Sequence, residues 1–595
     1  MFWKTGNISR CKNAAAILFL ALILVPVMVF AQERLISEIR IMGNEHISND
    51  AILAAIALKP GMPASEANLQ AAKKAIEGMG FFERVIVGTE TTDAGIRIIF
   101  NVVENPVITR IDITGNTVVP TSKILSFMRV APGSVLNTNT LLQQDIPSIE
   151  RYYESQGYIA YVTEEVGIDP KTGVLRIPIL EVRVQDIKVT GNVKTQTYVI
   201  LREMKLKPGD VFNRNTLFAD LRRIYDLNIF DREAAEPYRL DPGSSIGQVI
   251  ITIPVKERKT GEVSVGVGYS TQNQLLGQVR VSEHNFKGKG QTISFMWEQS
   301  VNNGSSLEVG FFEPWLDDKH TSLNVNLYDK LVFRFAGDTF GTLTGSTNYD
   351  ERRQGGSATF GRPLDDTSRG FFTLRYESVL PNATNSLPFP LNESGNIASG
   401  TFRITNSIRD SEVDPTRGAY SSYAFELGRA NFEAQGNVFT KLSGDFRWYS
   451  SPGQPRAEAS FEPRPVFATR LKVGTYTGNV PFFEQYFLGG AESIRGFRED
   501  RFWGRYTMLA STEYRFPLGS SMTGVLFMDA GDAWGADEAY RTPDIFPELP
   551  QHGNFSPQFG YGVGIRVSTP IGPLRLDYGL SNEGSRAHFS IGHVF

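Results

Sequence analysis

The sequence predicts three tandem small α/β domains followed by an antiparallel transmembrane β-barrel of 16 strands. Three observations lead to this prediction. An apolar segment typical of an export signal stands near the N-terminus, a unit with fixed internal spacing then recurs three times, and from Gly261 onward apolar and polar residues alternate with a period of two. A polytopic helical membrane protein is excluded, because no run of 18 apolar residues follows residue 31.

Composition excludes several classes of protein. The chain has 595 residues, with 60 Lys and Arg against 64 Asp and Glu, and a net charge of −4. A general nucleic-acid binder would show a strongly basic domain or stripe, so we expect no nucleic-acid partner. A single cysteine excludes a disulfide scaffold and a cysteine-based zinc site.

The first 31 residues are predicted to be a signal peptide. Three basic residues precede an apolar run over 14–29, and small residues allow cleavage after Ala31. An uncleaved membrane anchor is the alternative, although the run is short for a membrane span. The protein is therefore predicted to leave the cytoplasm. We expect no ATP-driven chemistry on the far side of the membrane, and no P-loop motif is present.

Three copies of one unit follow, predicted as domains over 33–105, 106–183 and 184–258. Each begins with a short strand that ends in Gly-Asn, has Pro-Gly 17 residues after that glycine, and closes with an alternating strand. The order strand, helix, helix, strand, strand predicts a small two-layer domain. Such a sheet exposes an edge that can accept an extended segment by strand addition, whereas the plainer interpretation is a spacer. The Gly-Asn pairs are Gly43-Asn44, Gly115-Asn116 and Gly191-Asn192.

Residues 261–595 are predicted to form the barrel. In LRLDYGL (574–580) the apolar residues face one way, and Arg575, Asp577 and Gly579 face the other. An apolar, aromatic-rich face opposite a face with ion pairs and glycines is typical of lipid outside and a polar lumen inside. A soluble β-sandwich is the alternative, since its strands alternate too.

Motifs for catalysis or metal binding are weak. The GxSxG match at 243–247 precedes a strand, whereas a nucleophile elbow needs a following helix. The six histidines form no HxxxH pair. We therefore expect no enzymatic activity, no catalytic residues, no cofactor and no metal.

Five local segments of the barrel region are distinctive: EHNFKGKGQ (Glu283–Gln291), RDSEVDPTRG (Arg409–Gly418), TPIGPLRLDYG (Thr569–Gly579), GGAESIRGF (Gly489–Phe497) and the aromatic-x-Asp-x-Gly segment Phe527–Gly531. With these motifs the chain resembles the BamA/TamA superfamily of outer-membrane protein insertases and translocases, over essentially all of the predicted mature sequence. The resemblance implies that the three repeats are periplasmic POTRA domains and that the tail is a 16-stranded barrel of the surface antigen type.

The most specific of these segments predicts an anchored loop in the lumen. A long loop that folds into a polar lumen needs an anchor, and a guanidinium-carboxylate pair is directional and bidentate. The resemblance implies that Arg495 reaches Asp529. Gly496 allows the turn that presents the arginine, and Phe497 can pack on the wall. The predicted anchor residues are Ile494, Arg495, Gly496, Phe497, Asp529 and Gly531.

The predicted function is the assembly of unfolded outer-membrane β-barrel clients, which the repeats collect and the barrel inserts at its seam. A short seam between the first and last strands would open and pair with a client strand, and Gly266, Gly268 and Gly592 would weaken it. The predicted seam residues are Val263, Val265, Val267, Tyr269, Phe589, Ile591, Gly592 and Phe595.

The expected location is the outer membrane, with the repeats in the periplasm or on the equivalent side in an organelle, and with outer-membrane lipid around the barrel. Periplasmic chaperones, accessory lipoproteins or an inner-membrane partner are candidate further partners. A two-partner-secretion pore for an exoprotein is the main alternative, although such pores carry a plugging helix before two repeats. A passive porin leaves the repeats unexplained. Three repeats are similar to TamA or to a short insertase, and the sequence leaves both open.

Overall fold

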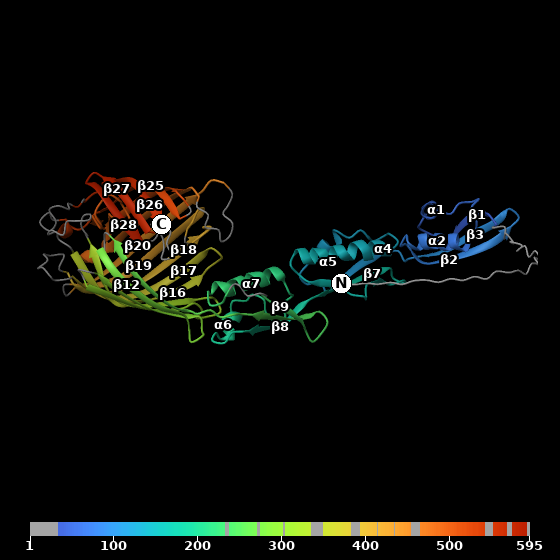
Figure 1. Cartoon of the computed structure of the whole chain (residues 1–595), viewed down its shortest axis with the longest axis horizontal. Coiled ribbons are helices and arrows are strands. Elements are labelled where there is room, and N and C mark those ends of the chain that lie inside the picture. The colour runs from blue at the N-terminus through green and yellow to red at the C-terminus, as the bar shows by residue number, and fades with distance from the viewer. Residues whose placement is uncertain are drawn as a thin grey trace, which may run out of the picture. The chain divides into compact units, whose positions relative to one another are not determined.

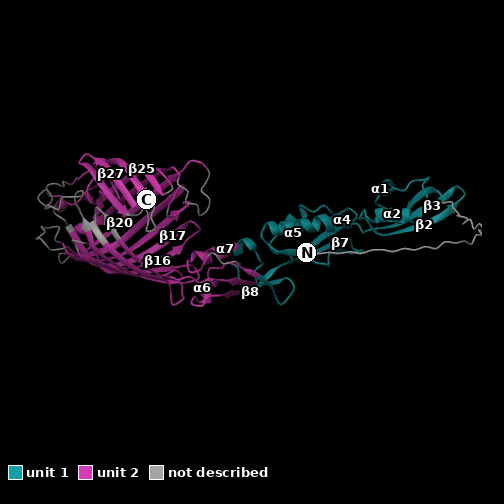
Figure 2. Ribbon diagram, viewed as in Figure 1, with its two compact units in different colours: residues 1–187, 206–217, 240–250 teal, residues 188–205, 218–239, 251–595 magenta. Residues whose placement is uncertain are grey.

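The computed structural model describes residues 34–231, 237–270, 274–300, 304–334, 349–381, 393–412, 414–432, 435–453, 464–519, 521–541, 551, 553–567 and 574–591. The predicted signal peptide lies outside this range. The chain divides into two compact units, one of residues 1–187, 206–217 and 240–250, the other of residues 188–205, 218–239 and 251–595 (Figure 2). None of the helices in the described ranges reaches the length and apolarity needed to cross a membrane.

Each repeat has a small sheet with helices. The first and third repeats follow the predicted order, and the second has additional short helical segments and a fourth strand. The sheet orders are β1-β3-β2, β4-β7-β5 with β6 beside β7, and β8-β10-β9. The first repeat has β1 (Ile36–Met42), α1 (Asn49–Ala55), α2 (Glu66–Glu77), β2 (Phe82–Thr92) and β3 (Gly95–Glu104). The second has β4 (Arg110–Thr114), α3 (Thr121–Leu125), α4 (Thr138–Thr140), η1 (Leu141–Asp145), α5 (Ile146–Ser155), β5 (Ala160–Val162), β6 (Gly167–Ile168) and β7 (Val174–Glu181). The third has β8 (Arg183–Thr190), α6 (Thr197–Leu201), α7 (Arg214–Asp226), β9 (Arg239–Pro242) and β10 (Gln248–Pro254).

The Gly-Asn pairs make the same turn in all three repeats. Gly43, Gly115 and Gly191 have φ of 88°, 82° and 89°. A Cβ on any of them would lie 2.0–2.3 Å from a backbone oxygen of the closing strand, so this turn requires glycine. The following asparagine fixes the turn by donating to a carbonyl three residues later, as Asn116 does to Val119 at 2.9 Å.

A glutamate at the end of each closing segment then caps this turn. Glu104, Glu181 and Glu257 each accept backbone N–H groups that follow the Gly-Asn pair. Glu181 is buried, and it accepts from Thr117 N at 2.7 Å, from Val118 N at 3.0 Å and from the Tyr153 hydroxyl at 3.1 Å. Hydrogen bonds from several donors stabilise the charged carboxylate in this position.

The second half of the chain forms the predicted 16-stranded antiparallel sheet, which confirms the predicted fold class (Figure 1, green through red). Consecutive strands pair throughout, except that β21 pairs with β24 across an intervening hairpin. The strands are β11 (Gly261–Ser270), β12 (Gln274–Phe286), β13 (Gln291–Ser300), β14 (Gly304–Glu313), β15 (Ser322–Arg334), β16 (Tyr349–Pro363), β17 (Ser368–Pro381), β18 (Gly395–Ser407), β19 (Gly418–Phe432), β20 (Gln435–Ser450), β21 (Val466–Gly478), β24 (Tyr506–Pro517), β25 (Met522–Trp534), β26 (Gln558–Val567), β27 (Leu574–Ser581) and β28 (Gly584–Ile591).

The two faces of this sheet differ as the alternation predicts. Leu576 and Tyr578 of β27 are 50% and 48% exposed, whereas Arg575 and Asp577 between them are each 1% exposed. A sheet with apolar side chains outside and ion pairs inside fits a hydrocarbon exterior and a polar interior. The inner face therefore holds the charged side chains that build a site.

We predict that Glu181→Gln destabilises the second repeat, because the amide cannot accept all the bonds that the buried carboxylate accepts. The loss is about 2 kcal/mol, which lowers the unfolding midpoint by roughly 10 °C. The measurement is thermal unfolding of the full chain in detergent, followed by helical circular dichroism, since helices α1–α7 belong to the repeats. Glu165→Gln, at an exposed position, serves as the control and leaves the midpoint unchanged.

We predict that acid destabilises the third repeat through Glu257. Burial alone would raise the pKa of Glu257, but donors from Thr195 and Lys194 outweigh it and lower the pKa. A lowered pKa in the folded state gives stability that is present above about pH 4.3 and is lost as the pH falls further. The helical midpoint should drop over that range, and it should drop less in Glu257→Gln. An equal drop in both proteins would contradict this assignment.

Candidate functional site in the barrel lumen

The segment 479–505 between β21 and β24, here called the lumen loop, carries the predicted anchor residues. It contains η2 (Phe482–Glu484) and a short hairpin of β22 (Tyr486–Leu488) and β23 (Phe502–Gly504). Ile494, Arg495 and Phe497 have no measurable exposure. A loop buried to this degree needs partners for its charged groups.

Arg495 binds Asp529 of β25 in a bidentate pair. Nε donates to Oδ2 at 2.7 Å and Nη2 donates to Oδ1 at 2.8 Å, while the backbone N–H of Arg495 adds a third bond at 3.1 Å. Nη1 donates to Glu513 of β24 at 2.6 Å. Burial alone would lower the pKa of Arg495, but the carboxylates of Asp529 and Glu513 outweigh it and raise the pKa.

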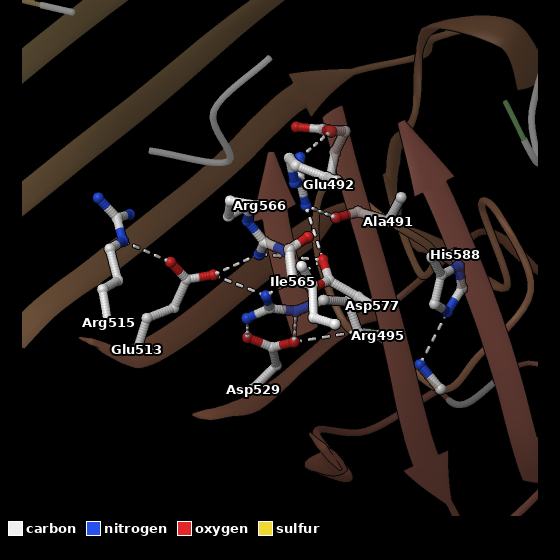
Figure 3. Close-up of polar contacts among 12 residues, drawn as sticks. Ala491, Glu492, Arg495, Glu513, Arg515, Asp529, Ile565, Arg566, Asp577 and His588 are labelled. Atoms are coloured by element: carbon white, nitrogen blue, oxygen red, sulfur yellow. Dashed lines mark hydrogen bonds and ion pairs between the residues drawn. The ribbon is translucent and has the colours of Figure 1, made fainter. Parts of the chain in front are cut away.

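The wall around this pair is a continuous ion network (Figure 3). Arg515 Nε donates to Glu513 at 2.9 Å, and Arg566 bridges Glu513 and Asp577. Arg575 donates to Asp577 at 3.2 Å. Strands β24, β26 and β27 thus contribute both signs of charge, so the network compensates the charge that the loop brings in.

Glycine and apolar residues make room for the arginine. Gly496 has φ of 96°, and a Cβ there would lie 2.9 Å from the backbone of Leu580. A Cβ on Gly531 would lie 2.4 Å from a backbone oxygen of β24 and 3.4 Å from Ile494. Phe497 packs edge-to-face on Phe502 at 5.1 Å between ring centroids. The loop therefore docks with close backbone contact.

The same loop contacts the last strands of the sheet. The backbone N–H of Gly496 donates to His588 Nε2 of β28 at 3.0 Å (Figure 3), and Ser581 donates to the carbonyl of Gly496 at 2.8 Å. Arg575 donates to the carbonyl of Ala491 at 3.0 Å. These contacts tie the lumen loop to β27 and to β28.

Several members of this site were not predicted from the sequence. Glu513, Arg566, Arg575, Asp577 and His588 stand on four different strands, and only register brings them together. The sequence signal available for these residues was a polar side chain at a strand position that faces the lumen. It marked Arg575 and Asp577 as lumen-facing, but it could not identify their partners.

The predicted seam strands, β11 and β28, are the first and last strands of the sheet. β11 and β28 contact each other, and no backbone ladder joins them within the described residues. Val263 and Val265 are 69% and 74% exposed on the outer face, and Phe589 is half-buried. The remaining seam positions fall outside the described residues, in their side chains for Val267, Tyr269 and Ile591 and entirely for Gly592 and Phe595.

The EHNFKGKGQ segment forms the turn between β12 and β13, and it contacts residues of the third repeat. Asn285 is buried and donates to the Thr195 hydroxyl at 2.9 Å. Gln196 N donates to the carbonyl of Gly288 at 2.8 Å, and a Cβ on Gly288 would lie 1.9 Å from the Lys194 oxygen. This turn therefore docks residues of the third repeat at one end of the barrel.

Of the other two motif segments, Arg409–Gly418 forms the connection between β18 and β19. There Thr416 N and Arg417 N donate to Asp410 at 2.8 and 3.1 Å. The segment Thr569–Gly579 is described only from Leu574 onward, where it forms β27.

Two family comparisons match this architecture. Residues 285–595 match the Omp85 superfamily domain, and residues 35–105, 106–179 and 182–258 match POTRA, the surface antigen variable number repeat.

The chain is also similar in sequence to named proteins and in fold to a solved structure. Outer envelope protein 80, chloroplastic, of Arabidopsis thaliana is 26% identical over 563 residues, which cover 87% of this chain and 71% of that protein. Outer membrane protein assembly factor BamA of Nitratidesulfovibrio vulgaris is 25% identical over 490 residues, covering 76% of this chain but only 57% of that protein. The crystal structure of BamA from Haemophilus ducreyi lacking POTRA domains 1–3 has a TM-score of 0.57 at 18% identity, covers 82% of this chain and 99% of that one, and shows the same fold.

We predict that Arg495→Lys weakens the folded barrel, because one ammonium cannot reproduce the bidentate bond to Asp529 and the bond to Glu513. Lysine keeps the charge but loses charge-assisted hydrogen bonds, each of which contributes about 1.5–3 kcal/mol. Samples are heated to a series of temperatures and run on a denaturing electrophoresis gel. The measurement is the temperature at which the band of the folded barrel disappears. Arg403→Lys, an exposed arginine of β18, is the matched control and keeps the native temperature. Equal temperatures for both variants would contradict the anchoring role.

Proposed function

The chain belongs to the Omp85 superfamily, and from that premise we propose that it is an outer-membrane protein assembly factor. It collects unfolded β-barrel clients on its N-terminal repeats and inserts them into the outer membrane at the seam between β11 and β28. The relatives named as outer-membrane assembly factor and as outer envelope protein support both the activity and the location. Accessory lipoproteins, periplasmic chaperones or an inner-membrane partner would act on the repeats.

The observation that carries this proposal is the seam. Among the described residues, β11 and β28 are adjacent without a backbone ladder, while every other neighbouring pair in the order is hydrogen-bonded. An unpaired backbone group in hydrocarbon costs several kcal/mol, so a client strand gains by pairing with an open edge. The transfer of the client's apolar surface from water into lipid supplies the rest of the favourable free energy of insertion, and no covalent step is needed.

The two edges are not equivalent. β28 is held from inside by the lumen loop through His588, whereas β11 pairs only with β12 within the described residues. Gly266 of β11 offers no side chain to pack across the seam. The first strand is therefore the edge that detaches and presents its backbone to a client.

The repeats are suited to deliver an extended client. β2 is an 11-residue edge strand of the first repeat, and all but two of its residues are exposed or half-buried. Strand addition to such an edge recognises backbone rather than sequence, which suits clients of many sequences. The contact of Asn285 with Thr195 places residues of the third repeat beside the barrel strand that pairs with β11.

We predict that a disulfide between β11 and β28 abolishes client assembly. Cysteines introduced at Val265 and, in turn, at Ala587 or Phe589 test the seam in a chain whose single native cysteine, Cys11, is replaced by Ser. The measurement is the appearance of a heat-modifiable client in vesicles that contain this protein, before and after reduction.

The control joins Ala424 of β19 to Ser443 of β20, which are register partners within the sheet. This disulfide should leave assembly intact. Assembly that continues at the native rate with the seam fully cross-linked contradicts the seam mechanism. Unchanged abundance of every outer-membrane protein after depletion of this chain contradicts the proposed function as a whole.

A further inference from the structure

The lumen loop carries a second buried charge, of opposite sign to Arg495. Glu484 ends η2, 11 residues before Arg495, and is 4% exposed. It lies among cations of β16, β17 and β20, whereas Arg495 lies among residues of β24 to β27. The two charges of one loop are thus held by different strands of the barrel.

Three cations bind the Glu484 carboxylate. Arg375 donates through Nη1 at 3.1 Å and through Nη2 at 3.3 Å, Arg353 donates at 3.4 Å, and Lys441 donates through Nζ. Arg353 also donates to the carbonyl of Phe483 at 2.9 Å. Burial alone would raise the pKa of Glu484, but these cations outweigh it and lower the pKa well below its usual range.

The wall supports these cations with carboxylates of its own. Arg353 pairs with Glu351 at 2.6 Å and with Glu377 at 2.9 Å. Arg375 pairs with Glu377 at 2.9 Å and with Glu426 at 2.8 Å. Both arginines are therefore held in direction by the wall itself, as in a preorganised receptor for a carboxylate.

An aromatic residue accompanies each buried charge. Phe483 next to Glu484 is 2% exposed and belongs to a buried cluster with Val379, Ile397 and Phe439. Phe497 plays the same part near Arg495, in a cluster with Leu509 and Ala533. The first arm of the loop is held further by Glu393, which accepts from Phe482 N at 3.0 Å. At both buried charges of the loop, ion pairs are thus combined with apolar packing.

We propose that Glu484 is a positioning residue and that the lumen loop is a strut, which fixes the β16–β20 wall relative to the β24–β27 wall. A loop anchored only at Arg495 could move with the last strands when the seam opens. With Glu484 bound as well, the loop resists relative movement of the two walls. The role of this strut in insertion rests on the proposed function, but the mechanical claim does not.

The test measures the distance between the two walls directly. Spin labels on cysteines at Tyr376 of β17 and at Tyr578 of β27, both exposed on the outer face, report that distance in the full chain in lipid. We expect a narrow distribution in the parent protein, and one at least twice as wide in Glu484→Gln. The assembly rate should fall by about tenfold, which corresponds to about 1.4 kcal/mol.

Three further variants sharpen the test. Glu538→Gln, at an exposed position outside the lumen loop, is the matched control and should keep the parent distribution. In a chain that already carries Arg375→Gln, Glu484→Gln should widen the distribution less than it does in the parent protein, because one of the three ion pairs of Glu484 is already gone. If Glu484→Gln fails to fold, Glu484→Asp keeps the charge, shortens the reach and should still broaden the distribution.

A folded Glu484 variant with the parent distance distribution would overturn the strut. A broadened distribution in a protein that assembles no client in any form would leave the strut standing and would refute the proposed function instead. A distribution that broadens equally in Glu538→Gln would also overturn the strut, because the effect would not be specific to the buried carboxylate.

Discussion

The rest of the structure depends on one constraint, the hydrogen bonds of backbone groups that lie in hydrocarbon. A strand in lipid cannot leave its N–H and C=O groups unpaired, so 16 strands pair in series and bring their two ends together. The only edges in the described sheet are then β11 and β28. A site that offers backbone partners to another protein within the membrane must therefore lie at this seam.

The constraint on the inner face is electrostatic. Arg495, Glu513 and Asp577 are each at most 1% exposed, and isolated charges at such positions would be very unfavourable. They are tolerated because every charge meets its opposite with good geometry and because arginine donates in fixed directions. Removing one partner leaves another buried charge unpaired, so the network acts as a unit and holds the lumen loop in one position.

The sequence predicted features that repeat or alternate, and it failed where contacts join distant positions. The Gly-Asn turns recur with nearly identical φ, and the alternation in LRLDYGL matches the exposure of β27. Each closing segment also carries a glutamate, at 104, 181 and 257, and this recurrence is a signal in the sequence for its capping role. In the lumen, the family motifs implied the pair of Arg495 with Asp529, which the structure has. The other lumen contacts had no such signal, because Arg353 and Glu484 are 131 residues apart and meet only through barrel closure.

A barrel that opens its seam faces a mechanical problem that these contacts address. Once β11 separates from β28, the closed ring no longer fixes the curvature of the sheet, and the inherent twist of its strands can change that curvature. Ties across the lumen then become the remaining restraint on shape. The lumen loop supplies them by holding β28 through His588, the adjacent wall through Arg495 and a distant wall through Glu484. The opening is thereby confined to the first strand. A client strand then meets one defined edge on a barrel that keeps its shape.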